Sequence, residues 1–98
     1  MAVYSIWESK FPPEASTEGR RVTQRIWDDM TRFDGYLGHT LLEDLDNAGH
    51  LLIVSRWSSR ERADDVLAAY AEHPNALKVN RLVSSPRRRF LAAERHPR

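Results

Sequence analysis

The chain of 98 residues contains no cysteine, only four glycines and no long run of apolar residues. The lack of cysteine excludes disulfides, thiolate metal ligands and a cysteine nucleophile, and it fits a reducing compartment. The longest apolar run, Leu51 to Val54, is far shorter than the roughly 20 residues of a membrane-spanning helix. Residues 1–8 have neither the basic start nor the apolar stretch of a targeting sequence. We therefore expect a cytoplasmic protein.

The chain also has little net charge, +1 at neutral pH, so no overall field attracts nucleic acid or an anionic membrane. Its few glycines do not form a phosphate-binding loop. The histidines show none of the paired spacings of a metal site; they are His39, His50, His73 and His96. We expect neither a metal nor another cofactor, and no nucleic-acid or membrane partner.

What is present is a globular mixture of 41% apolar and 30% charged residues. A chain of this length forms one domain with one modest core. We place that domain at residues 2–93, followed by a short tail at 94–98.

The spacing of apolar residues predicts four strands and two main helices. The strands are expected at 2–11, 36–45, 50–57 and 86–93, with a hairpin at 46–49. The first helix is expected at 14–33 and ends at Asp34-Gly35. The second opens at Ser58, with Glu61 at capping-box spacing, and ends near Glu72 because Pro74 interrupts it. A short helical piece resumes at Asn75.

The predicted helices have apolar stripes that should face the sheet. The stripe of the first helix comprises Val22, Ile26, Met30 and Phe33. Those of the second and of its continuation comprise Ala63, Val66, Leu67, Tyr70, Ala76, Leu77, Asn80 and Val83. Spacings of three and four residues place each stripe on one side of its helix.

The order strand-helix-strand-strand-helix-strand predicts an α+β, ferredoxin-like fold, a four-stranded antiparallel sheet with both helices on one face. The first and third strands carry apolar residues on both faces. Tyr4, Ile6, Leu52 and Val54 should lie on the face without helices. A bare apolar sheet face usually marks an interface, and a second copy covers it most simply. We therefore expect a homodimer through this face.

Two segments resemble a known family. Residues 34–39, Asp-Gly-Tyr-Leu-Gly-His, resemble its glycine-aromatic approach to the second strand, and residues 50–61 resemble its strand-tryptophan-helix junction around Trp57. The chain is similar in this way to antibiotic biosynthesis monooxygenases over about residues 2–93. The resemblance implies a dimeric α+β barrel with a pocket between sheet and helices in each subunit. Members oxidise phenols, anthrones and quinols with molecular oxygen, without metal or flavin.

The resemblance and the expected faces suggest which residues carry chemistry. Trp57 matches the family's tryptophan at the end of the third strand. If Trp57 faces the pocket, strand alternation places the Trp7 side chain on the same, pocket-facing side of the sheet. His39 and His73 are candidate bases because histidine titrates near neutrality. The other candidates for the pocket are Tyr70, Asn80, Phe33 and Val66. Each also has a purely structural interpretation, as a core residue, a helix end or a local backbone partner.

The sequence departs from parts of the family pattern. Members often have an asparagine just upstream of the strand tryptophan, whereas this chain has Ile53, Val54 and Ser55. Haem-degrading relatives use an asparagine, a tryptophan and a histidine where an ungapped comparison places Trp7, Val66 and Asn75, and none matches. Haem degradation is therefore disfavoured.

Three functions stay open at this point. The first is cofactor-independent oxygenation of a phenolic, anthrone or quinol-type aromatic. The second is cyclisation or decarboxylation of a polyketide, and the third is small-molecule binding or protein interaction without catalysis. RNA-binding domains share this strand order, but the third strand lacks their stacking rings between Leu51 and Arg56. The basic run Arg87-Arg88-Arg89 is expected to pair with the acidic region at Glu43-Asp44.

Overall fold

The computed structural model describes residues 2–95. Its strands and α-helices, in chain order, are β1 (Val3–Lys10), α1 (Ser16–Asp29), β2 (Tyr36–Asp44), β3 (Asn47–Trp57), α2 (Arg60–Tyr70), α3 (Pro74–Leu82) and β4 (Arg88–Ala92). The predicted element order is confirmed, with the second helical region divided into α2 and α3. Residues 96–98 of the expected tail lie outside the described part of the chain.

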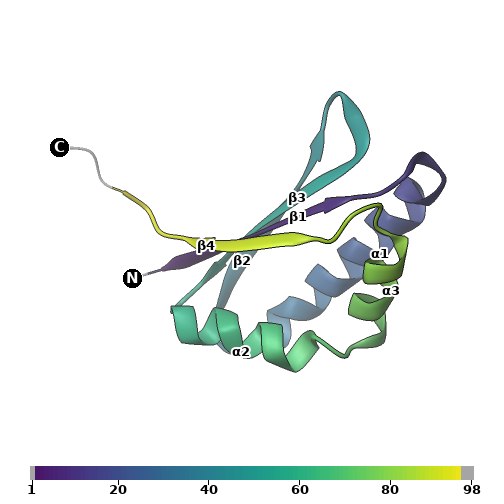
Figure 1. Cartoon of the computed structure of the whole chain (residues 1–98). Coiled ribbons are helices and arrows are strands. Elements are labelled where there is room, and N and C mark those ends of the chain that lie inside the picture. The colour runs from purple at the N-terminus through teal and green to yellow at the C-terminus, as the bar shows by residue number, and fades with distance from the viewer. Residues whose placement is uncertain (1, 96–98) are drawn as a thin grey trace.

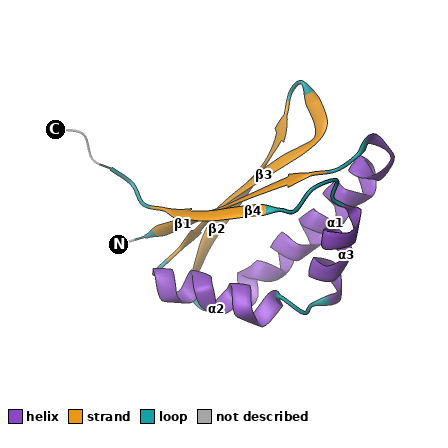
Figure 2. Cartoon of the chain, viewed as in Figure 1, coloured by secondary structure: helices purple, strands orange, loops and turns teal. Residues whose placement is uncertain are grey.

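The sheet is antiparallel with the strand order β2-β3-β1-β4, so β2 and β4 are its two edges. The three helices lie together on one side of it (Figure 1, Figure 2). This is the predicted ferredoxin-like arrangement. Strand alternation explains the layering, because Leu51, Ile53 and Trp57 are fully buried under the helices while Leu52 and Val54 between them are only half-buried.

The first helical region covers most of the expected range but is not one regular helix. A 3₁₀ turn at Pro13–Ala15 precedes α1, and another at Met30–Arg32 follows it. Proline at the first position suits such a start because its missing N–H has no helical partner there. The chain then turns at Gly35, whose φ of 87° favours glycine. The predicted stop at Asp34-Gly35 is therefore confirmed.

The hairpin between β2 and β3 is tighter than expected. β3 begins at Asn47, so the turn lies at Leu45 and Asp46 and not at 46–49, and the register shifts between Glu43 and Asp44. Gly49 lies within β3, where its carbonyl accepts a hydrogen bond from the Phe11 N–H at 2.8 Å. A Cβ at this position would lie 2.1 Å from the Phe11 carbonyl oxygen, so glycine here serves close backbone approach and not a turn.

The start of α2 and the inner face of α3 also differ from the prediction. Ser59, not Ser58, is the N-cap of α2, and its hydroxyl accepts a hydrogen bond from the Arg62 N–H at 3.2 Å. On α3, Ala76 and Val79 are buried, whereas Leu77 and Asn80 are exposed. The predicted inward position of Asn80 is wrong because Pro74 starts a new helix with its own phase.

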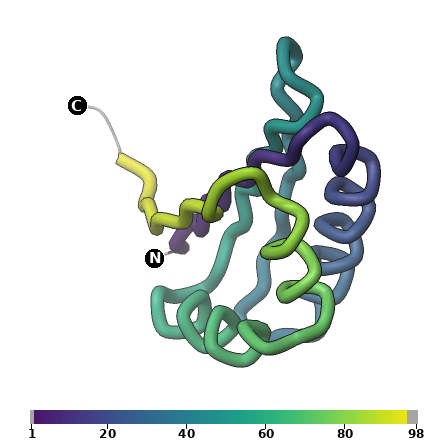
Figure 3. The backbone as a smooth tube through the Cα atoms, turned by 45° about the vertical axis from the view of Figure 1, so that its right-hand side comes forward, coloured from purple at the N-terminus to yellow at the C-terminus, as the bar shows by residue number. Residues whose placement is uncertain are grey.

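The face of the sheet that carries no helix is apolar in part. Tyr4, Ile6, Leu52 and Val54 lie there, half-buried within the single chain. On the same face Phe90 is 54% exposed and Leu42 is 46% exposed. In Figure 3 the hairpin between β2 and β3 projects beyond the helices. None of the helices among residues 2–95 is long and apolar enough to cross a membrane.

Candidate active site

A small cavity lies between the helix-covered face of the sheet and the helices. We call it the aromatic cavity, because all three tryptophans of the chain line it, together with Tyr70, Arg87 and Arg89. Its volume is about 60 Å³. Small side chains create this space, since Ser5, Ala63, Ala71 and Ala76 stand at positions where larger residues would fill it.

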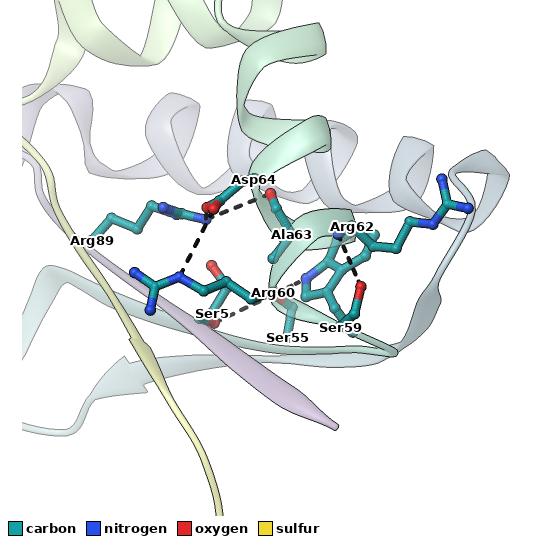
Figure 4. A network of polar contacts seen from close by, with 9 residues as sticks. Ser5, Ser55, Ser59, Arg60, Arg62, Ala63, Asp64 and Arg89 are labelled. Atoms are coloured by element: carbon teal, nitrogen blue, oxygen red, sulfur yellow. Dashed lines mark hydrogen bonds and ion pairs between the residues drawn. The ribbon is translucent and has the colours of Figure 1, made fainter. Parts of the chain in front are cut away.

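Trp57 is both a core residue and a wall of the cavity. It is 1% exposed, and its indole N–H donates to the Ser55 hydroxyl at 2.9 Å. The Ser55 hydroxyl in turn donates to the Ser5 carbonyl at 3.3 Å (Figure 4). The N–H of Trp57 is therefore satisfied within the protein, and what the side chain offers a ligand is the ring.

Tyr70 contributes a phenol to the lining of the cavity. It is 6% exposed, and its hydroxyl donates to Asp29 Oδ2 at 3.0 Å. Burial, followed by the hydrogen bond to Asp29, raises the pKa of the Tyr70 phenol above its ordinary value of 10.0. Tyr70 is therefore a neutral hydrogen-bond donor at physiological pH and not a base.

The other predicted pocket residues divide into two groups. Trp7 and Val66 line the cavity. Phe33 does not line it, because the α-helix has already ended at that residue. The Phe33 ring instead packs edge-on against Tyr70 from outside, with centroids 6.3 Å apart.

His39 lies outside the cavity. It stands on the edge strand β2, where its Nδ1 is 2.6 Å from the Tyr36 hydroxyl and its ring is 5.6 Å from that of Trp27. Trp27 lines the cavity and His39 does not. His39 is therefore one residue away from the space that it was expected to serve as a base.

His73 is also outside the cavity, and its nitrogen is occupied. It is the N-cap of α3, with its Nδ1 accepting a hydrogen bond from the Asn75 N–H at 3.1 Å. Its ring stacks on Tyr70 at a centroid distance of 4.2 Å. The Nδ1 lone pair of His73 is therefore already used within the protein. His73 begins α3, whereas the sequence had suggested a helix end.

Asn80 lines a second, more open pocket of about 610 Å³, together with Val83, Ser84, Ser85 and Pro86. We call this the outer pocket. Trp7 and Arg87 line both the outer pocket and the aromatic cavity. Asn80 accepts a hydrogen bond from Arg87 Nε at 2.9 Å, so it positions that arginine at the boundary between the two.

Two arginines that the sequence reasoning left out line the cavity. Arg87 lies over the Trp7 ring, with its Cζ 4.5 Å from the centroid. Arg89 reaches from β4 to α2, where its Nη2 donates to Asp64 Oδ1 at 3.2 Å and to the Ala63 carbonyl at 3.5 Å (Figure 4). Their expected pairing with Glu43-Asp44 is wrong, because β4 and β2 are opposite edges of the sheet.

The acidic residues at the far edge have other partners. Glu43 pairs with Arg20 at 2.8 Å, and Asp44 accepts from His50 Nδ1 at 2.9 Å. His50 Nε2 lies 2.7 Å from Glu8 Oε2 on the open face of the sheet. The two carboxylates raise the pKa of His50, Asp44 first and Glu8 second.

The lining of the aromatic cavity contains no carboxylate and no histidine among the described residues; its titratable groups are Tyr70, Arg87 and Arg89. Within residues 2–95 no group of three or more histidine or acidic side chains has the geometry of a metal site. The arrangement therefore offers a ligand aromatic surface, a phenol oxygen that can accept a hydrogen bond, and two cations.

The sequence model of the antibiotic biosynthesis monooxygenase family matches residues 2–76. That segment includes Trp7, Trp27, Trp57 and Tyr70, and it ends before the two cavity arginines. No curated protein matches the chain significantly.

Several solved structures share the fold. SnoaB, a cofactor-independent oxygenase from Streptomyces nogalater, is 21% identical, with a TM-score of 0.86 over 98% of this chain and 95% of that one. Rv0793 from Mycobacterium tuberculosis is 22% identical, with a TM-score of 0.78 over 99% and 98% of the two chains. A conserved protein from Methanosarcina mazei Go1 is 10% identical, with a TM-score of 0.81 over 97% and 94%.

Proposed function

The chain belongs to the antibiotic biosynthesis monooxygenase family, and from this premise we propose that it is a cofactor-independent oxygenase. Its substrate is an electron-rich aromatic of the phenol, anthrone or quinol type, bound at the aromatic cavity. The observation that carries this proposal is the convergence of all three tryptophans and Tyr70 on one space beside two cations. Such a lining suits a planar aromatic ring system.

The reaction needs no group that the chain lacks. An anthrone or phenol that has lost a proton gives one electron to O₂, and the resulting radical and superoxide combine to form a peroxide anion. This anion takes up a proton, equivalent to the one lost, and becomes a hydroperoxide. Loss of water from the hydroperoxide leaves a quinone. One oxygen atom of O₂ stays in the product, and the other leaves as water with two hydrogens from the substrate.

The protein supplies the environment for these steps. The buried rings of Trp27 and Trp57 exclude water from the reacting carbon, and the Tyr70 hydroxyl, whose proton is donated to Asp29, does not compete for the substrate proton. The lining of the cavity holds no histidine to act as base. Stabilisation of the substrate anion, which lowers the pKa of the substrate, takes the place of a base in this proposal.

A ring system must displace side chains to bind, because about 60 Å³ is less than the several hundred Å³ of an ordinary ligand pocket. Trp7 and Arg87 are the movable parts, since both line the aromatic cavity and the outer pocket. We propose that the ligand enters from the outer pocket and separates Arg87 from the Trp7 ring.

The functional unit in this proposal is a homodimer. Phe90 and Leu42 are about half exposed on the open face, beside the half-buried Tyr4, Ile6, Leu52 and Val54. Members of the family are typically homodimers. Packing of this face on a second copy would bury the apolar side chains and form the α+β barrel.

Oxygen consumption with an anthrone as test substrate distinguishes the possible reactions. The oxygenase proposal predicts one O₂ consumed per quinone formed, and one labelled oxygen atom in the product when the gas is ¹⁸O₂. Cyclisation or decarboxylation would proceed without oxygen uptake. Binding of the anthrone without any turnover would instead indicate a ligand-binding protein, and either result would overturn the proposal.

A further inference from the structure

The guanidinium group of Arg89 is only partly satisfied where it lies. Its side chain is 17% exposed, and it lines the aromatic cavity. Nη2 bonds to Asp64 and Ala63, but Nε is buried and has no hydrogen-bond partner among the described residues. A buried N–H without an acceptor costs free energy, more so on a charged group, and buried polar groups in native proteins are rarely left without a partner.

Arg87 adds a second charge that is not neutralised. Its polar and aromatic contacts are the side-chain Oδ1 of Asn80 and the Trp7 ring, and no ion pair within residues 2–95 includes it. Burial lowers the pKa of Arg87, as expected for a cation removed from water, although a guanidinium stays charged at neutral pH. This charge is therefore partly buried and has no counter-ion among the described residues.

The surroundings of the two arginines are positive overall. Asp64 is the one acidic side chain that pairs with either of them in the described chain, and it is half exposed and also 3.9 Å from Arg60. The cavity lining itself contributes no negative charge. A low-dielectric space with two cations and one shared carboxylate outside it favours an anion inside.

We propose that Arg87 and Arg89 form an anion-binding site of the aromatic cavity, so that the natural ligand is an aromatic carrying a carboxylate. The free Nε–H of Arg89 donates to one carboxylate oxygen, and Arg87 turns from the Trp7 ring to the other. Arginine suits this role because its donors match the planar carboxylate. This inference rests on the proposed function, since it defines the substrate class of the same cavity.

Two matched probes, 2-naphthoate and 2-naphthamide, test the site because they share a ring system and differ in charge. Calorimetric titration of the full chain should give an affinity about tenfold or more higher for 2-naphthoate. In Arg89→Gln and in Arg87→Gln this preference should fall to about threefold or less. Arg89→Lys, which keeps the charge but not the planar donors, should retain an intermediate preference.

Arg88→Gln is the control. It removes the same charge from the same strand, but Arg88 points to the open face, 3.7 Å from Glu8, and should leave the preference unchanged. A second measurement needs no substitution: it follows the Arg89 Nε–H signal in ¹H–¹⁵N spectra of the wild-type protein. That signal should shift with 2-naphthoate and not with 2-naphthamide, so the test does not depend on the folding of any variant.

The possible failures are separable. Equal affinity for the two probes would overturn the carboxylate site and leave the aromatic cavity and the proposed function standing. A preference that persists in both glutamine variants would place the anion elsewhere and also overturn the site. If neither probe binds, the carboxylate site and the aromatic cavity as a ligand site both fall.

Discussion

The indole N–H of Trp57 donates to the hydroxyl of Ser55, two residues earlier on the same strand, at a distance of 2.9 Å. Residues at this spacing share one face of a strand, so the contact holds the ring on the face of the sheet that the helices cover. The same ring then lines the aromatic cavity. In the proposed site, packing and ligand binding are thus combined in one residue, and substitutions there should affect both.

Trp57→Ala should destabilise the protein by about 3–5 kcal/mol, because a large and fully buried side chain is lost and leaves a cavity. Urea unfolding of the purified protein measures this. Trp57→Phe keeps an aromatic wall but removes the hydrogen bond to Ser55, and it should cost less. A loss of only about 1 kcal/mol in Trp57→Ala would show that the ring is a pocket wall with little part in packing.

Tyr70→Phe should leave the pH profile of activity unchanged, because the raised pKa of the phenol keeps it neutral throughout the physiological range. The variant loses the donor to Asp29, which should cost about 1 kcal/mol of stability. Initial rates measured between pH 6 and 9, together with urea unfolding, check both expectations. Loss of a basic limb from the profile in this variant would identify Tyr70 as a titrating catalytic group.

Most of the fold could be predicted from the sequence because the apolar residues recur at clear helical and strand spacings. Val22, Ile26 and Met30 identify the buried side of α1 and of the turn that follows it, and the alternation in β3 assigns its two faces correctly. Leu77 and Asn80 were misplaced because a helix restarted by proline does not continue the earlier phase. The N-cap could not be chosen between adjacent serines by spacing alone.

Only part of the candidate site could be predicted from the sequence, because the sheet topology decides which other residues reach the cavity. Trp57 was identified from the resemblance to the family, Trp7 from strand alternation relative to it, and Val66 and Tyr70 from the apolar stripe of the second helix. Arg89 reaches the cavity only because β4 pairs with β1, and its acidic partner Asp64 is on α2. His39 fails to reach the cavity because β2 is the opposite edge. The one signal in the sequence for the arginine pair was strand alternation, which places Arg87 and Arg89 on the same side and Arg88 on the other.

The cluster of His50 with Glu8 and Asp44 should make stability depend on pH. The pKa of His50 is raised above 6.5, so its contribution is complete below about 6.5 and is lost as the pH rises through the folded-state value. The pKa values of Glu8 and Asp44 are lowered, so these two groups act at acidic pH. Their contribution to stability is lost as the pH falls through their folded-state pKa values. His50→Gln should remove the alkaline part of this dependence in urea unfolding. An identical alkaline decline in His50→Gln would assign it to another group.

Val54→Lys should prevent dimer formation, because it places a charge in the centre of the open sheet face. Light scattering after size-exclusion chromatography should give a dimer mass for the wild type and a monomer mass for the variant. Gln24→Lys, at an exposed position of α1 on the other side of the molecule, is the control and should remain dimeric. A wild-type protein of monomer mass, or a dimeric Val54→Lys variant, would exclude this face as the interface.

The most direct measurement is the rate of oxygen uptake with an anthrone in Ala71→Phe, compared with Ala69→Phe. Ala71 lines the aromatic cavity and is exposed on its other side, so phenylalanine can block the space without replacing a core residue. Ala69, two residues earlier and within α2, is exposed and does not line the cavity. We predict that Ala71→Phe lowers the enzyme-dependent rate about tenfold or more, while Ala69→Phe keeps the wild-type rate. Equal rates in the two variants would contradict the assignment of the reaction to this cavity.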